Sequence, residues 1–290
     1  MLQREEQKNI IPFPPCLVAA CPVWLVTCLL TLVCIGTASG PRPLTNTTVM
    51  AATPAAWRVI ATAGTAPGKL TAPTYLALDK QGNVYVSDTG NHRIQKLSPD
   101  GQAFVQWGTS GYALGQFKSP TGIAVCGHGN IYVADMSNCR IQKLSPNGQV
   151  LAEWGMGGSG PGQFNYPMGI ALDTQGNVYV ADWGNHRIQK LSPEGGPLAQ
   201  WGTKGAGPAQ FNRPVGIALD IQGNIYVAEQ ENHRIQKFSP KGEPMAQWGS
   251  EGNEPGHFEF PVGIAVDARG NIYVAESANS RIQKLLAQLE

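Results

Sequence analysis

Short segments of β-branched, aromatic and alternating apolar residues recur along the chain, separated by polar turns. One stretch shows the pattern clearly: residues 168–173 (MGIALD), 177–182 (NVYVAD), 187–191 (RIQKL) and 197–202 (PLAQWG). Turn-forming Asp, Asn, Gly, Ser and Pro residues lie between these segments. Strands of this length with turn signals between them predict four short antiparallel β-strands.

The same pattern occurs five times along the chain. Residues 82–99 read GNVYVSDTGNHRIQKLSP, and related copies begin at Gly129, Gly176, Gly223 and Gly270, always 47 residues apart. A fixed period between 20 and 50 residues indicates a repeat architecture, and four short strands per period are typical of a propeller blade. The sequence therefore predicts an all-β, five-bladed β-propeller of four-stranded blades.

Prolines that open the first strand divide this domain, residues 57–290, into units. The units span residues 73–119, 120–166, 167–213, 214–260 and 261–290. A tryptophan ends the fourth strand of the first four units only, and 47 residues before Trp107 the chain has Ile60. We therefore expect residues 57–64 to supply the missing fourth strand, so that an N-terminal strand closes the last blade and leaves no open sheet edge.

The repeated unit GN[VI]YV[AS][DE]xxN[HCS]RIQK resembles the NHL repeat, from Trp57 to Glu290. The resemblance implies a β-propeller, although the family's usual number of blades is six rather than five. A sixth blade would need further sequence or an unrecognised unit, and residues 41–56 are too few to supply one.

The first 56 residues differ in character from the repeats. Residues 1–15 are polar and then proline-rich, residues 16–35 form an uncharged apolar run, and residues 41–56 are a Pro-, Thr- and Ala-rich linker. Twenty helical residues can span a bilayer, whereas a signal peptide is usually shorter and carries a positive leading region. Residues 16–40 are thus a transmembrane anchor or a cleaved signal peptide. Either function places the propeller outside the cytoplasm, anchored to a membrane or secreted.

Composition limits the possible partners. Hydrophobic residues make up 42% of the chain, charged residues 14%, and the formal net charge is +1. Basic residues are spread evenly over the repeats instead of forming the basic patch that nucleic acid requires, so no nucleic-acid partner is expected. We expect a monomer. Cys126 and Cys139 fall at opposite ends of one blade, and both are predicted to be unpaired.

Each repeat carries an acidic residue five positions before its arginine. The acid ends the second strand and the arginine opens the third, so antiparallel pairing brings the two side chains together. We predict five structural ion pairs, namely Asp88–Arg93, Asp135–Arg140, Asp182–Arg187, Glu229–Arg234 and Glu276–Arg281.

Other polar residues of the repeat could suggest a metal site. His92, His186 and His233 occupy one position in three different blades, too far apart to share a zinc ion, and are interpreted as exposed loop residues. A calcium ring of strand-end aspartates is conceivable, but Cys126 interrupts it and turn capping explains these residues. No metal and no cofactor are predicted; the aspartates are Asp79, Asp173, Asp220 and Asp267.

Several propellers of this kind are enzymes: an amidating lyase, gluconolactonase-like and strictosidine-synthase-like folds. Their sites resemble one another in using acids, Asn or His of the innermost strands. Here the innermost strands are nearly identical (YLALD, GIAVC, GIALD, GIALD, GIAVD) and provide no such group. We therefore expect no catalytic residues. The alternative is a metal-dependent lyase or lactonase that acts in the central channel.

Differences between the repeats concentrate in two sets of loops on one face of the propeller. Large aromatic side chains and arginine are typical anchors of binding surfaces. The candidate binding residues are Tyr166, Trp183, Arg213, Gln230 and Phe260. Tyr166 and Phe260 could instead pack between blades. The leading hypothesis is a non-enzymatic, extracytoplasmic binding or scaffold module that recognises a protein, peptide or glycan on this face.

Overall fold

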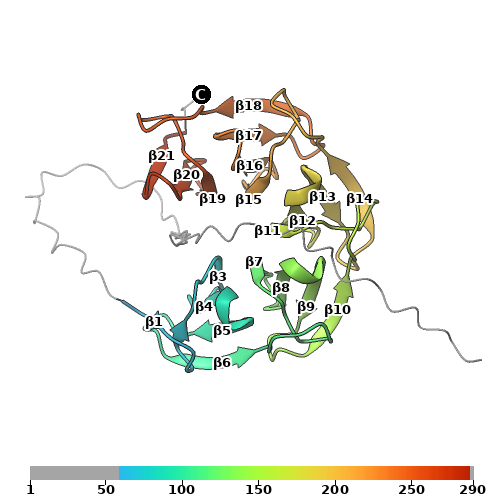
Figure 1. Ribbon diagram of the computed structural model, residues 1–290, viewed down its shortest axis with the longest axis vertical. Coiled ribbons are helices and arrows are strands. Elements are labelled where there is room, and N and C mark those ends of the chain that lie inside the picture. The colour runs from blue at the N-terminus through green and yellow to red at the C-terminus, as the bar shows by residue number, and fades with distance from the viewer. Residues whose placement is uncertain (1–58, 288–290) are drawn as a thin grey trace, which may run out of the picture.

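The computed structural model describes residues 59–287, which fold into five β-sheets arranged as the blades of a propeller (Figure 1). This confirms the predicted all-β class and the number of blades. We number the blades 1 to 5 in chain order. In every blade the first strand lies nearest the centre and the later strands follow outward in sequence order.

Blades 1 to 3 each contain four antiparallel strands. Blade 1 consists of β3 (Leu76–Leu78), β4 (Val84–Asp88), β5 (Arg93–Leu97) and β6 (Ala103–Trp107). Blade 2 consists of β7 (Pro120–Val125), β8 (Ile131–Asp135), β9 (Arg140–Leu144) and β10 (Val150–Trp154). Blade 3 consists of β11 (Pro167–Leu172), β12 (Val178–Asp182), β13 (Arg187–Leu191) and β14 (Pro197–Trp201).

Blade 4 has the same construction, and blade 5 has three strands among residues 59–287. Blade 4 consists of β15 (Pro214–Leu219), β16 (Ile225–Glu229), β17 (Arg234–Phe238) and β18 (Pro244–Trp248). Blade 5 consists of β19 (Pro261–Val266), β20 (Ile272–Glu276) and β21 (Arg281–Leu285). Three short 3-10 turns follow the second strands of blades 1 to 3: η1 (Thr89–Asn91), η2 (Met136–Asn138) and η3 (Trp183–Asn185).

The N-terminal strand does not close the last blade, so that prediction was wrong. β1 (Thr62–Ala63) pairs in parallel with β2 (Lys69–Leu70), in a small sheet of its own. The same parallel contact recurs 47 residues later between Ser110 and Phe117, in the loop before blade 2. Residues 62–70 therefore repeat the loop that leads into a blade. They belong to the entry of blade 1 and do not pair with β21.

Apolar side chains from neighbouring blades form the core. Between blades 2 and 3, Tyr132 and Ile141 of one sheet meet Val178 and Val180 of the next, and Phe164 of the connecting loop completes the cluster. Equivalent clusters join blades 1 and 2, 3 and 4, and 4 and 5. Because blades 2, 3 and 4 each bury one face against the blade before and the other against the blade after, their inner strands are apolar on both sides.

Glycines on the innermost strands set how closely the blades approach. A Cβ at Gly169 would lie 2.4 Å from the carbonyl oxygen of Val215 on the next blade, and one at Gly122 would lie 2.2 Å from that of Met168. Real Cβ atoms do not approach this closely, so the repeated glycine is a packing requirement.

The parts of the chain before residue 59 lie outside the described residues. These include the predicted polar segment 1–15, the anchor or signal peptide 16–40, and the linker 41–56. Between residues 59 and 287, no helix has both the length and the apolar character needed to cross a bilayer.

The two cysteines of the repeats differ. Cys126 is free, as predicted. Cys139 is disulfide-bonded, so the prediction of an unpaired thiol was wrong there. That prediction considered only a bridge between these two residues, which does not form.

Candidate functional site

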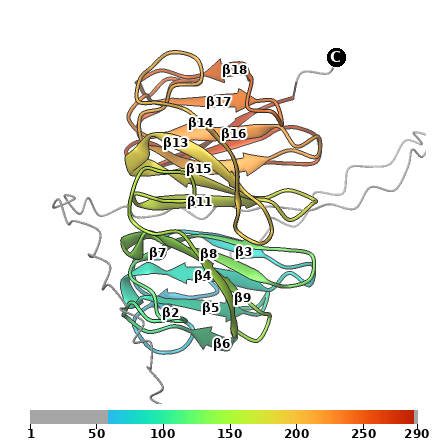
Figure 2. The same ribbon diagram turned by 90° about the vertical axis from the view of Figure 1, so that its right-hand side faces the viewer.

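The candidate site lies on the face of the propeller from which the 3-10 turns project, the left-hand side in Figure 2. The loops that lead into the first strand of each blade reach this same face. In blade 3, for example, the amide of Gly184 in η3 donates a hydrogen bond of 2.8 Å to the carbonyl of Asn165, in the loop before β11. Each blade thus presents two adjacent loops there, and their side chains differ from blade to blade.

Four of the five predicted binding residues meet at the junction of blades 3 and 4. The rings of Tyr166 and Trp183 meet edge to face, with 6.1 Å between their centres. The guanidinium carbon of Arg213 lies 4.4 Å from the centre of the Trp183 ring. On blade 4, Gln230 accepts a hydrogen bond of 3.3 Å from Trp183 Nε1. We call Tyr166, Trp183, Arg213 and Gln230 the aromatic–arginine patch.

A fifth residue fixes the charged end of this patch. Glu231 Oε1 accepts a hydrogen bond of 2.9 Å from Arg213 Nη1, and both side chains are partly open to solvent, 34% and 44% exposed. An exposed ion pair adds little to stability. Its effect is geometric, because it holds the guanidinium plane over the indole of Trp183. Sequence reasoning missed Glu231, although its place beside Gln230 was visible in the repeat.

Phe260 lies apart from the patch and packs between blades. Its ring centre is 5.0 Å from that of His233 on blade 4, and its amide donates to His233 Nδ1 at 3.4 Å. This is the packing role that the sequence left open for Phe260. Tyr166 contacts Trp183 of its own blade instead.

Three of the five candidate binding residues have a backbone conformation that is unusual for their residue types. Tyr166, Arg213 and Phe260 have positive φ values of 54°, 56° and 49°. The two equivalent residues in the loops before blades 1 and 2 share this left-handed conformation, but they are the small residues Ala72 and Ser119. A left-handed conformation is costly for bulky residues, and such strain gathers at functional sites. Large side chains at this position, Tyr166, Arg213 and Phe260, therefore distinguish the surface of blades 3 to 5 from that of blades 1 and 2.

The three repeated histidines join neighbouring blades. His186 Nδ1 accepts a hydrogen bond of 3.2 Å from the amide of Arg213, and His92 Nδ1 accepts one of 3.0 Å from the amide of Ser119. All three are half-buried and not the exposed loop residues that the sequence suggested. Burial, followed by the positive charges of Lys204 and Arg213, lowers the pKa of His186. The neutral ring that can accept this bond is therefore favoured at the edge of the patch.

The acid–arginine pairs lie beneath this surface, in the interior of each blade. The five N–O distances run from 2.6 to 2.8 Å, and all five acids are buried. In blade 3, Arg187 also donates to the carbonyls of Gly160 and Gln163, and Asp182 accepts from the amide of Asn165. The pair thus ties the loop between blades to the sheet, which is a structural role.

Burial raises the pKa of Asp182, although hydrogen bonds from Asn165, Asn185 and Arg187 act in the opposite direction. The cost of burying this carboxylate is therefore only partly offset by its partners. The blade depends on keeping the arginine in place.

The strand-end aspartates cap turns. Asp79 accepts hydrogen bonds from the amides of Gln81 and Asn83 and from the side chain of Asn83, at 2.8 to 3.0 Å. Asp173, Asp220 and Asp267 make the same contacts in blades 3, 4 and 5. Among residues 59–287, no three His, Cys, Asp or Glu side chains come together in a way that could hold a metal ion.

One residue breaks the symmetry of the innermost strands, and sequence reasoning missed it. Tyr75 occupies the position of Gly122, Gly169 and Gly216 in the following blades. Its hydroxyl donates a hydrogen bond of 3.1 Å to the carbonyl of Val215 on β15, so its side chain crosses the centre of the propeller. A tyrosine where the other repeats have glycine was the available signal.

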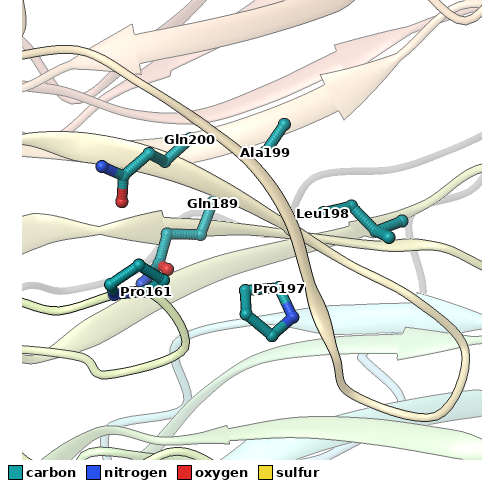
Figure 3. Close-up of a pocket in the computed structure, with 6 residues that line it drawn as sticks. All are labelled: Pro161, Gln189, Pro197, Leu198, Ala199 and Gln200. Carbon is teal, nitrogen blue, oxygen red and sulfur yellow. The ribbon is translucent and has the colours of Figure 1, made fainter.

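A shallow pocket of about 280 Å³ lies at the outer edge of blade 3 (Figure 3). Its wall consists of Pro161, Gln189, Pro197, Leu198, Ala199 and Gln200. Both glutamine side chains already have partners, since Gln189 accepts from the amide of Gly162 and Gln200 accepts from Arg187. With no titratable side chain in its wall, this pocket offers no group for acid–base chemistry.

Solved structures with a similar fold include enzymes. A streptogramin B lyase is 23% identical, with a TM-score of 0.55, over 75% of this chain and 70% of that one. A catalytically inactive virginiamycin B lyase from Staphylococcus aureus with quinupristin is 19% identical, with a TM-score of 0.56, over 78% and 73%. A gluconolactonase from Xanthomonas campestris is 16% identical, with a TM-score of 0.54, over 74% and 75%. Likeness at this identity shows the fold alone.

No protein with a curated description matches the chain in sequence. The family model of the NHL repeat matches five times, once in each blade. The matched residues are 70–97, 117–144, 164–191, 211–238 and 258–285. The five matches follow the 47-residue period and begin at β2 or at the equivalent bridge residue before each blade. The chain therefore belongs to the NHL repeat family.

Proposed function

We propose that this protein is a non-enzymatic recognition module that binds a protein, peptide or glycan through the aromatic–arginine patch. The observation that carries the proposal is the stacking of Arg213 on Trp183, with Tyr166 at its edge and Gln230 on the neighbouring blade. Aromatic and arginine side chains dominate the energetics of binding surfaces. Only the junction of blades 3 and 4 combines these groups within the described residues.

The centre of the propeller supports a binding role better than a catalytic one. Tyr75 spans it and bonds to Val215, and the inner strands β7, β11, β15 and β19 carry proline, glycine and apolar residues with one threonine, Thr121, and no acid, Asn or His. A lyase or lactonase in the channel is the competing function. Its test is metal analysis of the full chain purified in detergent, together with a hydrolase and lyase screen. Stoichiometric calcium or zinc with turnover would favour that class.

We also propose that the propeller lies outside the cytoplasm, either anchored to a membrane by residues 16–40 or secreted after their cleavage. It rests on the uncharged apolar run at residues 16–35. Protease treatment of intact cells that express the full chain tests it. If the propeller were digested only after the cells had been permeabilised, so that the protease could enter the cytoplasm, the result would contradict the proposal.

The binding test compares the full chain with Trp183→Ala combined with Arg213→Ala, on arrays of peptides, proteins and glycans. Met136→Ala is the matched control, because Met136 occupies the position of Trp183 on blade 2. We expect the double variant to lose the ligands that the original chain and the control retain. Ligands bound equally by all three proteins would place recognition elsewhere.

A further inference from the structure

Blade 2 lacks the carboxylate that caps the turn after the first strand in the other four blades. Cys126 stands directly after β7, where the other repeats have aspartate. Its side chain packs against the core cluster that contains Tyr132 and is partly open to solvent. The next two residues, Gly127 and His128, are exposed. A small reactant can therefore reach this thiol, which lies on the face of the propeller opposite the aromatic–arginine patch.

In blade 3, five donor groups converge on the carboxylate at the equivalent position. Asp173 accepts hydrogen bonds from the amides of Gln175 and Asn177 and from the side chain of Asn177, at 2.8 to 3.0 Å. The hydroxyl of Tyr179 at 3.4 Å and the ammonium of Lys190 at 3.3 Å complete the set. Burial acts to raise the pKa of Asp173, but the hydrogen bonds of Asn177 and the charge of Lys190 outweigh it, so the pKa is lowered. These donors therefore stabilise a negative charge at the end of the first strand.

Blade 2 keeps the same donor groups although the carboxylate is absent. Its turn has the same two backbone hydrogen bonds as the other blades: the amide of Cys126 donates to the carbonyl of Asn130 at 3.0 Å, and the amide of Gly129 donates to the carbonyl of Cys126 at 2.8 Å. Lys143 lies over the ring of Tyr132 with 5.3 Å between the ammonium and the ring centre. The lysines of the other four blades lie over their tyrosines in the same way, at 4.9 to 5.2 Å. The amides, the tyrosine and the lysine are thus arranged around Cys126 as they are around the aspartates.

Tyr132 shows most directly that these donors lack an acceptor. In each of the other blades the equivalent hydroxyl donates to the strand-end aspartate at 3.1 to 3.4 Å. Tyr132 is only 3% exposed, and its hydroxyl has no hydrogen-bond partner between residues 59 and 287. Lys143 pairs with no carboxylate in this part of the chain and donates instead to the carbonyl of Pro193 at 3.3 Å. Because a thiol is only a weak acceptor, blade 2 is built around an anion that Cys126 does not supply in its reduced form.

We propose that Cys126 is a site of oxidation by a hydroperoxide, and that its sulfinate form replaces the missing carboxylate and completes the cap of blade 2. A sulfinate carries two oxygens and a negative charge on the atom bonded to Cβ, as the carboxylate of aspartate does. The turn amides and Tyr132 donate to these oxygens, and Lys143 provides the opposite charge. Partly exposed cysteines in electropositive surroundings are the reactive ones. A second lysine contributes to these surroundings, because Lys80 Nζ lies 3.5 Å from the place that a Cβ on Gly127 would occupy.

Two peroxide molecules are consumed in this reaction. The sulfur of Cys126 bonds to one oxygen of the first peroxide, the O–O bond breaks, and the departing oxygen takes up the thiol proton and leaves as water. The product is the sulfenic acid. The second peroxide adds its oxygen to the sulfur in the same way, which releases a second water and gives the sulfinic acid. The sulfur has then lost four electrons, each peroxide has gained two, and the acid loses its proton to solvent.

The test treats the full chain in detergent with hydrogen peroxide and follows two quantities. Tandem mass spectrometry of the peptide that contains Cys126 should show two added oxygen atoms on this residue. Thermal unfolding should show a rise in Tm of about 2–4 °C, because the sulfinate gives the donors of blade 2 their acceptor. Cys126→Asp should raise the Tm by a similar amount without peroxide and should gain nothing further from it.

Three variants separate Cys126 from the other oxidisable residues of the chain. Cys126→Ser should show no rise in Tm on treatment, which accounts for the remaining cysteines and the methionines. Lys143→Met should lose most of the rise, because the sulfinate then lacks its opposite charge. Lys190→Met is the matched control: it removes the equivalent lysine of blade 3, so its own Tm falls but the rise on treatment should remain.

The products at Cys126 decide the outcome even where a variant does not fold. A thiol that stays unmodified, that stops at the sulfenic acid, that links two chains or that passes through to the sulfonate would overturn the proposal. A sulfinate that leaves the Tm of the original chain unchanged or lowers it would also overturn it. So would an equal rise in Tm in Cys126→Ser or in Lys143→Met.

Discussion

Arg213 lies over the indole ring of Trp183, with 4.4 Å between the guanidinium carbon and the ring centre. The two residues belong to different loops, and each has a second partner on blade 4: Glu231 for the arginine and Gln230 for the tryptophan. Four side chains are thus fixed against one another before any ligand arrives. A preorganised surface loses less conformational entropy on binding, which favours this patch as a recognition site.

Acidification should loosen the patch through His186. Its pKa is lowered by burial and by Lys204 and Arg213, so the folded protein favours the neutral ring that accepts from the Arg213 amide. The contribution is present above the ordinary pKa of 6.5 and is lost as the pH falls through the folded value. We expect the Tm difference between the original chain and His186→Phe to shrink between pH 7.5 and 5. A difference that grows on acidification would contradict this assignment.

Removal of one buried arginine should cost more than removal of its partly exposed counterpart. Arg187 is 7% exposed and leaves Asp182 buried without its charge partner, so Arg187→Met should cost about 3–5 kcal/mol of unfolding free energy. Arg281 is 28% exposed, and Arg281→Met should cost clearly less. Urea unfolding of both variants measures the difference. Equal losses of unfolding free energy in the two variants would contradict the difference in burial between these two ion pairs.

The closeness of the blades can be tested at a glycine. A Cβ at Gly169 would lie 2.4 Å from the backbone of blade 4, so Gly169→Ala should destabilise by about 1–3 kcal/mol. Gly127 is the control, because its Cβ would meet only the flexible end of Lys80, at 3.5 Å. Gly127→Ala should be neutral or slightly stabilising. Thermal unfolding of the two variants separates packing from the general effect of losing a glycine.

Much of the fold follows from the repeat. The period of 47 residues and the four strand-like segments predicted the blades, because each blade repeats one local pattern of turns and apolar residues. The acid and the arginine could be paired from strand register alone. The closing strand could not, because stepping back by one period identifies which residue is equivalent but not which sheet it pairs with. Thr62 and Ala63 are held by β2 beside blade 1.

The site was accessible from the sequence only in part. Comparison of the five copies identified Trp183 and Arg213, because their positions on one face of the propeller carry different residues from blade to blade. Their stacking depends on the left-handed backbone at Arg213 and on Glu231, which hold the guanidinium in place. Tyr75 was overlooked because the segment YLALD was read as one more copy of an apolar strand, although its first residue replaces a glycine.

The most direct test of the proposed binding surface is the affinity of the full chain for a ligand selected on the arrays, measured by isothermal titration calorimetry. Cation–π and aromatic contacts of this kind contribute about 1–2 kcal/mol each when they are desolvated. We predict that Trp183→Ala and Arg213→Ala each weaken binding by about tenfold or more, whereas Met136→Ala leaves it unchanged. Unchanged affinity in both patch variants would contradict it.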